Sequence, residues 1–318
     1  MPEMELMDVI HQPGDLQVDE EVSKYIKAAT SDNTRLAYQN DIRHFEEQRG
    51  SLPTTPEIIV EYLQECVHTL NPRTLRRRMT ALRQWHKLKG FEDPTDNPSV
   101  RRTISGISRL HGKPRKQALA LRLEDLDRMV GFLDEKGDAI SFRNRALLLV
   151  GFFGALRRSE LISLKWEDVQ FVTDGMIVTL PRSKTDQMGE GTRCVIPFGN
   201  ESRCPVRALI DWRQASHPSG GLIFRRISKT GTISEKGISP RHWNRILRQL
   251  AKDIGLPNPE QFSSHSLRRG FATEASRLGA SMPSIQRHGR WRSTKTVLEY
   301  IEAGRQFADS AVNVLFKS

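Results

Sequence analysis

Apolar residues in the first third of the chain follow the spacing of α-helices. They recur at intervals of three and four, which places them on one face of a helix. We expect one helix around Leu36–Phe45 and two more that open at Pro56 and Pro72, because proline is favoured in the first turn. The residues that can cap the first helix are Asp32, Asn33 and Thr34. The apolar stripes are Leu36, Ile42 and Phe45, then Ile59, Tyr62, Leu63, Cys66 and Val67, then Leu75, Met79, Leu82 and His86.

The pattern changes after these helices. Glu92–Pro98 holds two prolines and two aspartates, which is typical of a turn, and Gly106–Lys116 has glycine and proline among positive charges, which indicates a linker. Beyond it, Phe142–Leu156 is strongly apolar and predicts a central helix. Met176–Pro181 and Arg193–Pro197 carry β-branched residues and predict strands. Other expected elements are a helical stripe of Leu126, Met129, Val130 and Leu133, a short strand at Leu222–Phe224, and helices at Pro240–Ile254, Ser266–Leu278, Ser284–His288, Thr294–Ile301 and Phe307–Phe316.

These elements predict a mostly α-helical protein with a small β-sheet. We expect an acidic leader over residues 1–23, a helical domain over 24–105 and a basic linker over 106–118. The remaining residues, 119–318, are expected to form an α+β domain that ends in an apolar helix at about 306–318.

The composition excludes several classes of protein. With 318 residues the chain is long enough for roughly two domains, and no apolar run reaches the ~18 residues of a membrane span. Met1–Glu21 carries seven acidic residues and no Lys or Arg, unlike a signal peptide or a mitochondrial presequence. The three cysteines form no CxxC pair, which argues against a disulfide scaffold or a closed zinc site. We therefore expect a soluble, cytoplasmic protein.

Positive charge gathers in two stretches without acidic residues. The chain has 49 Lys and Arg against 38 Asp and Glu, a formal net charge of +11. One acid-free stretch lies between Glu65 and Glu92, and the other runs from Asn97 to Leu123. A solvated basic face explains either stretch alone, but two of them favour a polyanionic partner such as DNA. The residues expected to contact DNA are Arg35, Arg43, Arg73, Arg76, Arg77, Arg78, Arg83, Lys87, Lys113, Arg115 and Lys116.

Metal-dependent and nucleotide-dependent chemistry has no support in the sequence. The chain contains no Walker A loop and no GxGxxG, HExxH or EF-hand pattern. Asp125 and Asp127 lie where the N-terminus of a helix favours negative charge, so stabilisation of that helix explains them. We expect no metal ion and no cofactor.

Four short segments carry candidate chemistry. They are Gly154-Ala-Leu-Arg-Arg-Ser-Glu-Leu161, Arg182-Ser-Lys-Thr185, His265-Ser-Leu-Arg268, and Gly289-Arg-Trp291 followed nine residues later by Tyr300. Taken singly, each has an ordinary explanation: Arg157 or His265 caps a helix, Lys184 lies in a turn, and Tyr300 fills a core. Taken together, in this order and spacing, they indicate one site.

This order of residues resembles the tyrosine recombinases, also called phage integrases. The shared pattern is R-x-x-E-L, a hairpin Lys, H-x-x-R, then Trp and Tyr, and the resemblance covers about residues 24–318. Much of the family has His at the position of Trp291. Trp291 and Lys116-Gln-Ala-Leu-Ala120 make the chain similar to Cre-type recombinases, and His288, three residues earlier, is treated as secondary.

The residue types suit cleavage of DNA without a metal ion. Arg157 and Arg268 can hold the non-bridging oxygens of a phosphate and remain charged at any relevant pH. His265 and the indole N–H of Trp291 can complete that set of donors. Glu160 cannot contact a phosphate, so we expect it to orient the cationic groups.

The same pattern contains a nucleophile and an acid. The Tyr300 phenol is a nucleophile once its proton is lost, and Lys184 can protonate the departing 5′ oxygen. The resemblance implies that the product is a 3′-phosphotyrosyl bond, which stores the energy of the phosphodiester so that rejoining needs no ATP.

The resemblance also implies an assembly. Such recombinases form a C-shaped clamp on double-stranded DNA and act as homotetramers on two specific sites, through a Holliday junction, in bacterial, phage or plasmid settings. The last helix is expected to dock into a neighbouring protomer through Phe307, Ala311, Val314 and Leu315, and the alternative is that it packs on its own domain. The alternatives are a type IB topoisomerase, a telomere resolvase, or a DNA-binding relative without catalysis.

Overall fold

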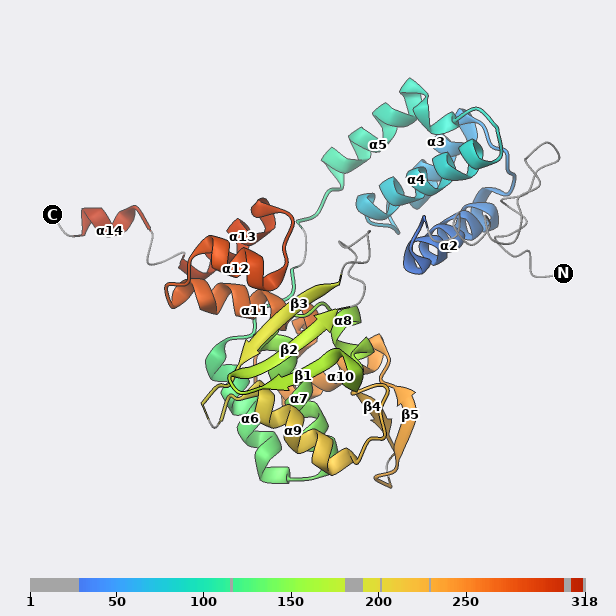
Figure 1. The fold of residues 1–318 in the computed structure, drawn as a ribbon. Coiled ribbons are helices and arrows are strands. Elements are labelled where there is room, and N and C mark those ends of the chain that lie inside the picture. The colour runs from blue at the N-terminus through green and yellow to red at the C-terminus, as the bar shows by residue number, and fades with distance from the viewer. Residues whose placement is uncertain are drawn as a thin grey trace. The chain divides into compact units, whose positions relative to one another are not determined.

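The computed structural model divides into two units by its internal contacts (Figure 1). Unit 1 is Met1–Arg115 and unit 2 is Lys116–Ser318, so the division falls inside the segment 106–118 expected as a linker. The structure describes residues 29–114, 117–180, 191–200, 202–228, 230–305 and 310–316. The acidic leader, Arg115, Lys116, Lys184 and Phe307 lie outside the described residues.

Unit 1 is helical in its described part. Its elements are α2 (Asp32–Arg49), α3 (Pro56–Cys66), α4 (Pro72–Leu88), the 3-10 turn η1 (Pro94–Asp96) and α5 (Pro98–Leu110). Proline opens α3 and α4 as the sequence predicts. The predicted caps of α2 are wrong: Ser31 has the extended backbone of a capping residue and its Oγ accepts from the Thr34 N–H, whereas Asp32 already begins the helix.

Helix α5 was not expected, and it corrects the predicted start of the linker. Residues 106–110 continue the helix, because Val100, Ile104 and Ile107 recur at helical spacing and are buried in the core of unit 1. The glycine and the basic residues of this stretch conceal that pattern in the sequence. The core that these residues join includes Phe45, Ile59, Tyr62, Leu63, Leu75 and Leu82.

Unit 2 is built around helix α7 (Ala139–Phe153), which is buried almost throughout. It packs against α6 (Leu123–Lys136), α9 (Pro205–Ser216) and α11 (Ser264–Arg277). Helix α9 was not expected. Further helices of unit 2 are α8 (Arg158–Ser163), α10 (Pro240–Asp253), α12 (Met282–Gly289) and α13 (Thr294–Arg305), with the 3-10 turns η2 (Trp166–Asp168) and η3 (Pro259–Gln261).

The described part of unit 2 also contains two small antiparallel sheets. The first has the order β1 (Val169–Val172), β2 (Gly175–Leu180) and β3 (Thr192–Pro197), with Val178 opposite Cys194. The second pairs β4 (Arg225–Ile227) with β5 (Ile233–Gly237). The predicted strand at Leu222–Phe224 is wrong: these residues precede β4, and burial of Ile223 and Phe224 explains their apolar character. The prediction of a mostly helical fold with a small sheet is confirmed.

The end of the chain contains only a short helix among the described residues. Helix α14 spans Val312–Leu315, and the predicted helix at Phe307–Phe316 otherwise falls partly outside the described part. Leu315 and Phe316 are 72% and 81% exposed. None of the described helices is long and apolar enough to span a membrane.

Candidate active site

A tight turn between α7 and α8 positions Arg157. Ala155 has a positive φ of 43°, which reverses the chain so that Arg157 becomes the N-cap of α8. The Arg157 backbone N–H donates to Glu160 Oε2 at 2.8 Å, and its Nη1 donates to Glu160 Oε1 at 2.5 Å. Its Nη2 donates to the carbonyl of Arg290 at 3.3 Å. The Arg157 guanidinium is therefore held from two sides, and Glu160 is buried against it.

Arg268 comes from α11 and is 4% exposed. Its Nη1 donates to the Ala155 carbonyl and its Nη2 to the Gly289 carbonyl. Its guanidinium carbon lies 4.1 Å from the centroid of the Trp291 ring, which is a cation–π contact. Burial, and then the nearby guanidiniums of Arg157 and Arg290, lower the pKa of Arg268 to about 9. A bound anion would relieve that repulsion.

The aromatic residues of the motif come together at the end of α12 and on α13. The Trp291 and Tyr300 rings meet edge to face, with centroids 6.0 Å apart. Gly289 permits the Trp291 position, because a Cβ there would lie 1.6 Å from the indole ring. The Tyr300 ring also packs beside Val297 in a small apolar cluster, so it contributes to a core as well as to the motif.

The contacts of α13 with α11 set the position of Tyr300. Thr273 Oγ1 donates to the Tyr300 carbonyl at 3.2 Å, and the Arg269 guanidinium lies 5.7 Å from the centre of its ring. Gly304 allows the two helices to approach, because a Cβ there would be 2.4 Å from the Thr273 carbonyl oxygen. Helix α11 thus carries both Arg268 and the residues that support Tyr300.

His265 lies exposed in the first turn of α11, three residues before Arg268. It is not the cap of that helix, since Ser263 has the extended backbone and its Oγ accepts from the His265 N–H. Lys184 belongs to the segment 181–190, outside the described residues. Of the sequence-predicted catalytic set, the structure brings together Arg157, Arg268, Trp291 and Tyr300.

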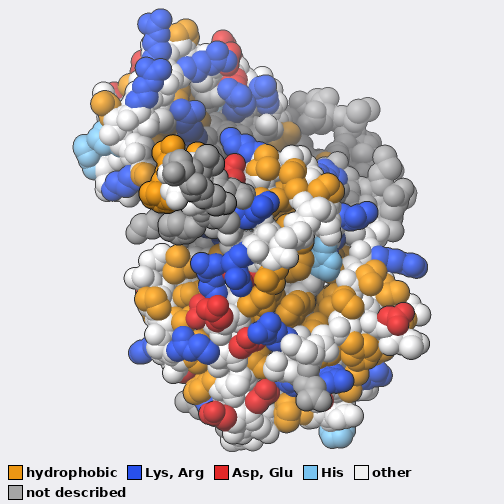
Figure 2. Space-filling view, turned by 90° about the vertical axis from the view of Figure 1, so that its left-hand side faces the viewer, with side chains coloured by type: hydrophobic (Ala, Val, Ile, Leu, Met, Phe, Trp, Pro, Cys, Tyr) orange, Lys and Arg blue, Asp and Glu red, His pale blue; other side chains and the backbone are white. Residues whose placement is uncertain are grey.

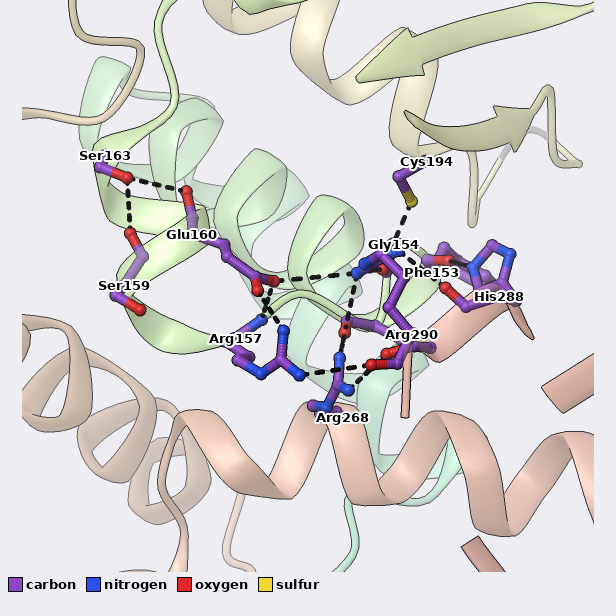
Figure 3. A network of polar contacts seen from close by, with 12 residues as sticks. Phe153, Gly154, Arg157, Ser159, Glu160, Ser163, Cys194, Arg268, His288 and Arg290 are labelled. Atoms are coloured by element: carbon purple, nitrogen blue, oxygen red, sulfur yellow. Dashed lines mark hydrogen bonds and ion pairs between the residues drawn. The ribbon is translucent and has the colours of Figure 1, made fainter. Parts of the chain in front are cut away.

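Sequence reasoning gave Arg290 no role, although it lies in a motif segment. Figure 3 shows its guanidinium between the α7–α8 turn and the end of α12. It donates to the carbonyls of His288 at 2.7 Å and Gly154 at 2.9 Å, and lies 3.8 Å from a Glu160 oxygen. The sequence did contain a sign of this position, because Arg290 directly precedes Trp291 in a segment that already belongs to the motif.

His288 takes a supporting position. Its Nε2 donates to the Phe153 carbonyl at 2.6 Å, and its ring stacks on Phe271 with centroids 4.7 Å apart. Burial lowers the pKa of His288, so the imidazole is neutral near pH 7. A neutral ring bonded to a main-chain carbonyl helps to fix the end of α12 against α7.

The candidate DNA contacts on α4 divide into two groups. Arg77 is half exposed and both its Nε and Nη2 donate to the buried carboxylate of Asp41 at 2.7 Å. Arg78 is buried and donates to the Tyr62 hydroxyl at 2.6 Å, so its assignment as a DNA contact is wrong. The reason is its position on the same helical face as the buried Leu75 and Leu82.

The other candidates on unit 1 remain at the surface. Arg76 donates to Ser108 Oγ, Arg83 lies 2.9 Å from Asp93, and Arg35 pairs with Asp32. Of all the candidate DNA contacts on unit 1, the exposed ones are Arg43, Arg73, Arg76, Arg77, Lys87 and Lys113. Lys and Arg side chains are prominent on this unit, at the top of the view in Figure 2.

Comparisons with known proteins agree on one family. The model of the phage integrase family matches residues 120–306. An integrase/recombinase XerD homolog of Selenomonas ruminantium is 33% identical over 92% of this chain and 87% of its own length. The recombinase Cre of Escherichia phage P1 is 25% identical over 80% of this chain and 77% of its own length.

A solved structure shows the same fold. It is the XerH site-specific recombinase bound to a palindromic difH substrate, with a TM-score of 0.65 and 18% identity, covering 89% of this chain and 79% of that one. At this identity the likeness concerns the fold alone.

Proposed function

The chain belongs to the phage integrase family and is a site-specific tyrosine recombinase, and from this premise we propose that Tyr300 is its nucleophile. The observation that supports the proposal most is the convergence of Arg157 and Arg268. Their Nη2 atoms donate to the adjacent carbonyls of Arg290 and Gly289, so both guanidiniums reach the same turn that carries Trp291.

The proposed step is an exchange of one ester for another. The Tyr300 oxygen attacks the phosphorus as its proton leaves, and the bond from phosphorus to the 5′ oxygen breaks. Arg157 and Arg268 stabilise the doubly negative pentacoordinate state, and His265 and the Trp291 indole donate to the same oxygens. Lys184 gives the 5′ oxygen its proton. Attack by a free 5′ hydroxyl reverses the step, so the DNA is rejoined with no cofactor.

The substrate we propose is double-stranded DNA with a specific recombination site. The exposed arginines of α4 support it, because a duplex backbone presents a row of negative charges to them. Each unit also carries exposed basic residues, which suits contacts with the backbone of a duplex. The relatives come from bacteria and a bacteriophage, so bacterial, phage or plasmid DNA is the expected source of the site.

We propose that the active form is a homotetramer on two sites that passes through a Holliday junction. The exposed Leu315 and Phe316 at the end of the chain support docking of this end into a neighbouring protomer. Incubation with a nicked duplex, followed by a denaturing gel, tests the core of the proposal, since a covalent protein–DNA adduct migrates more slowly than the free protein.

Lys184→Ala is expected to slow cleavage of an ordinary phosphodiester by about 10²–10⁴-fold, because the 5′ oxygen leaves without a proton. The variant should regain most of that rate on a substrate with sulfur at the 5′ bridging position, since a thiolate leaves unprotonated. Single-turnover cleavage of both substrates by both proteins measures the effect. An equal defect on the two substrates would contradict the role of Lys184 as an acid.

Replacement of Arg73, Arg76 and Arg77 by Gln is expected to flatten the salt dependence of DNA binding. Each phosphate contact that is lost reduces the slope of log affinity against log salt by about 1. Fluorescence anisotropy with a labelled duplex at several salt concentrations gives the slope. Arg78→Gln is the matched comparison. Because Arg78 is buried, its replacement should lower the thermal midpoint of unfolding and leave the salt slope of DNA binding unchanged. An unchanged slope in the triple variant would show that α4 does not contact phosphate.

A further inference from the structure

Arg290 is a charged residue in an unfavourable position. Its backbone has a φ of 56°, in the left-handed region that side chains with a Cβ rarely adopt, and its side chain is only 7% exposed. A buried guanidinium also loses its hydration. The left-handed backbone and the lost hydration both destabilise the folded protein at this residue. The groups that surround the Arg290 side chain offset these costs.

The contacts of Arg290 join the two segments that hold the proposed catalytic arginines. Its Nη2 donates to the carbonyls of Gly154 and Ala155 at 2.9 and 3.3 Å, in the turn that leads to Arg157. Arg268 donates to the same Ala155 carbonyl, and Arg157 donates to the carbonyl of Arg290 itself (Figure 3). Arg290 therefore shares a hydrogen-bond partner with one arginine and is a partner of the other.

The charge of Arg290 also bears on Glu160. The Glu160 carboxylate contacts Arg157 at 2.5 Å and lies 3.8 Å from Arg290 Nη2. With Arg290 absent, Glu160 would be balanced by Arg157 alone, and the charge that Arg157 presents to a phosphate would be reduced. With Arg290 present, the described cluster has three guanidiniums and one carboxylate, a net charge of +2. That charge matches the doubly negative state formed during phosphoryl transfer.

We propose that Arg290 is a positioning residue: it balances Glu160, so that the positive charge of Arg157 remains available to the phosphate, and it fixes the Gly154–Ala155 turn, so that Arg157 and Arg268 keep their direction. This inference rests on the proposed function, because it assigns those two arginines to the scissile phosphate. In this proposal Arg290 acts through these two arginines and not through a contact of its own with the phosphate.

Arg290→Gln and Arg290→Gly test the proposal, with Arg225→Gln as the control. The Arg225 side chain is equally buried, at 7% exposure, and donates to the Ser216 carbonyl away from the cluster. We expect both Arg290 variants to lose about 10²-fold in the single-turnover cleavage rate, with DNA affinity within threefold of wild type. Glycine relieves the left-handed backbone, so a purely conformational role would leave Arg290→Gly fully active, and that result would overturn the proposal.

The double variant Glu160→Gln with Arg290→Gln separates charge balance from general damage. If Arg290 balances Glu160, the double variant, which lacks both charges, should cleave DNA about tenfold faster than Arg290→Gln. Arg290→Lys keeps the charge without the planar fork and should retain an intermediate rate. A double variant no faster than Arg290→Gln, with a thermal midpoint lowered as in Arg225→Gln, would show that Arg290 only stabilises the fold.

A measurement without DNA keeps this inference separate from the recombinase proposal. In protein with ¹⁵N-labelled arginine, Arg290→Gln should broaden or shift the guanidinium signals of Arg157 and Arg268, and Arg225→Gln should leave them unchanged. If wild-type protein forms no adduct, the proposed function fails, and these signals still show whether Arg290 positions its neighbours. Unchanged signals would refute the positioning role even if the wild-type protein cleaves DNA.

Discussion

Tyr300→Phe protein is expected to bind its DNA with unchanged affinity and to form no covalent adduct. The substitution removes one hydroxyl and keeps the ring that packs edge to face on Trp291 and beside Val297. The helix position also remains, because the contact from Thr273 goes to the main-chain carbonyl of Tyr300. Stability should therefore change little, and the loss of adduct should be complete because phenylalanine has no nucleophile.

The test is a denaturing gel of protein incubated with nicked duplexes from the flanks of its gene. The chain has only four tyrosines, so the nucleophile can be assigned by elimination. Tyr25→Phe, Tyr38→Phe and Tyr62→Phe are the control variants, and all three should form the adduct. An adduct in the Tyr300 variant would refute the assignment, whereas binding without an adduct in the wild type would favour a DNA-binding relative without catalysis.

Arg268→Gln is expected to lower the single-turnover cleavage rate by about 10³-fold or more. In other enzymes, a guanidinium that stabilises the charge of a transferring phosphoryl group raises the reaction rate about 10³–10⁵-fold. The low exposure of Arg268 strengthens its electrostatic effect. Arg268→Lys should recover only part of the loss, because an ammonium cannot bond both the Ala155 and Gly289 carbonyls while facing a phosphate.

Arg277→Gln controls for the loss of an arginine from the same helix. Arg277 pairs with the buried Glu274 and lies outside the cluster, so its loss should change stability more than the rate of cleavage. Thermal unfolding and DNA affinity are measured in parallel with the rate. If Arg268→Gln cleaves within tenfold of wild type, Arg268 does not stabilise the reacting phosphate.

Local signals made parts of the fold predictable. Helices α3 and α4 open at Pro56 and Pro72 as expected, because a proline in the first turn and an apolar stripe act within one element. The central helix at residues 139–153 was visible for a different reason: burial on nearly all sides makes its sequence apolar throughout. Strands β2 and β3 were found within a residue of their bounds.

Elements with a weak local pattern were missed. Strands β4 and β5 are short and exposed in part, so they lack a run of β-branched residues, and the apolar pattern predicts the strand at the neighbouring Leu222–Phe224 instead. In α5 the buried residues Val100, Ile104 and Ile107 are spaced regularly, but basic side chains and Gly106 surround them. Only the packing of unit 1 selects helix over linker there.

The sequence by itself determined the family, the mostly helical fold and the residue types of the site, since their order along the chain is a one-dimensional property. The tertiary structure alone decided which of these side chains meet and which face the solvent. Arg77 and Arg78 are neighbours in the sequence, yet one is half exposed and the other is buried, because successive residues of a helix point about 100° apart. Arg290 bonds one nearby carbonyl, that of His288, but it also bonds the carbonyls of Gly154 and Ala155, which are more than a hundred residues away. No local pattern encodes such contacts, because they exist only after distant segments have packed.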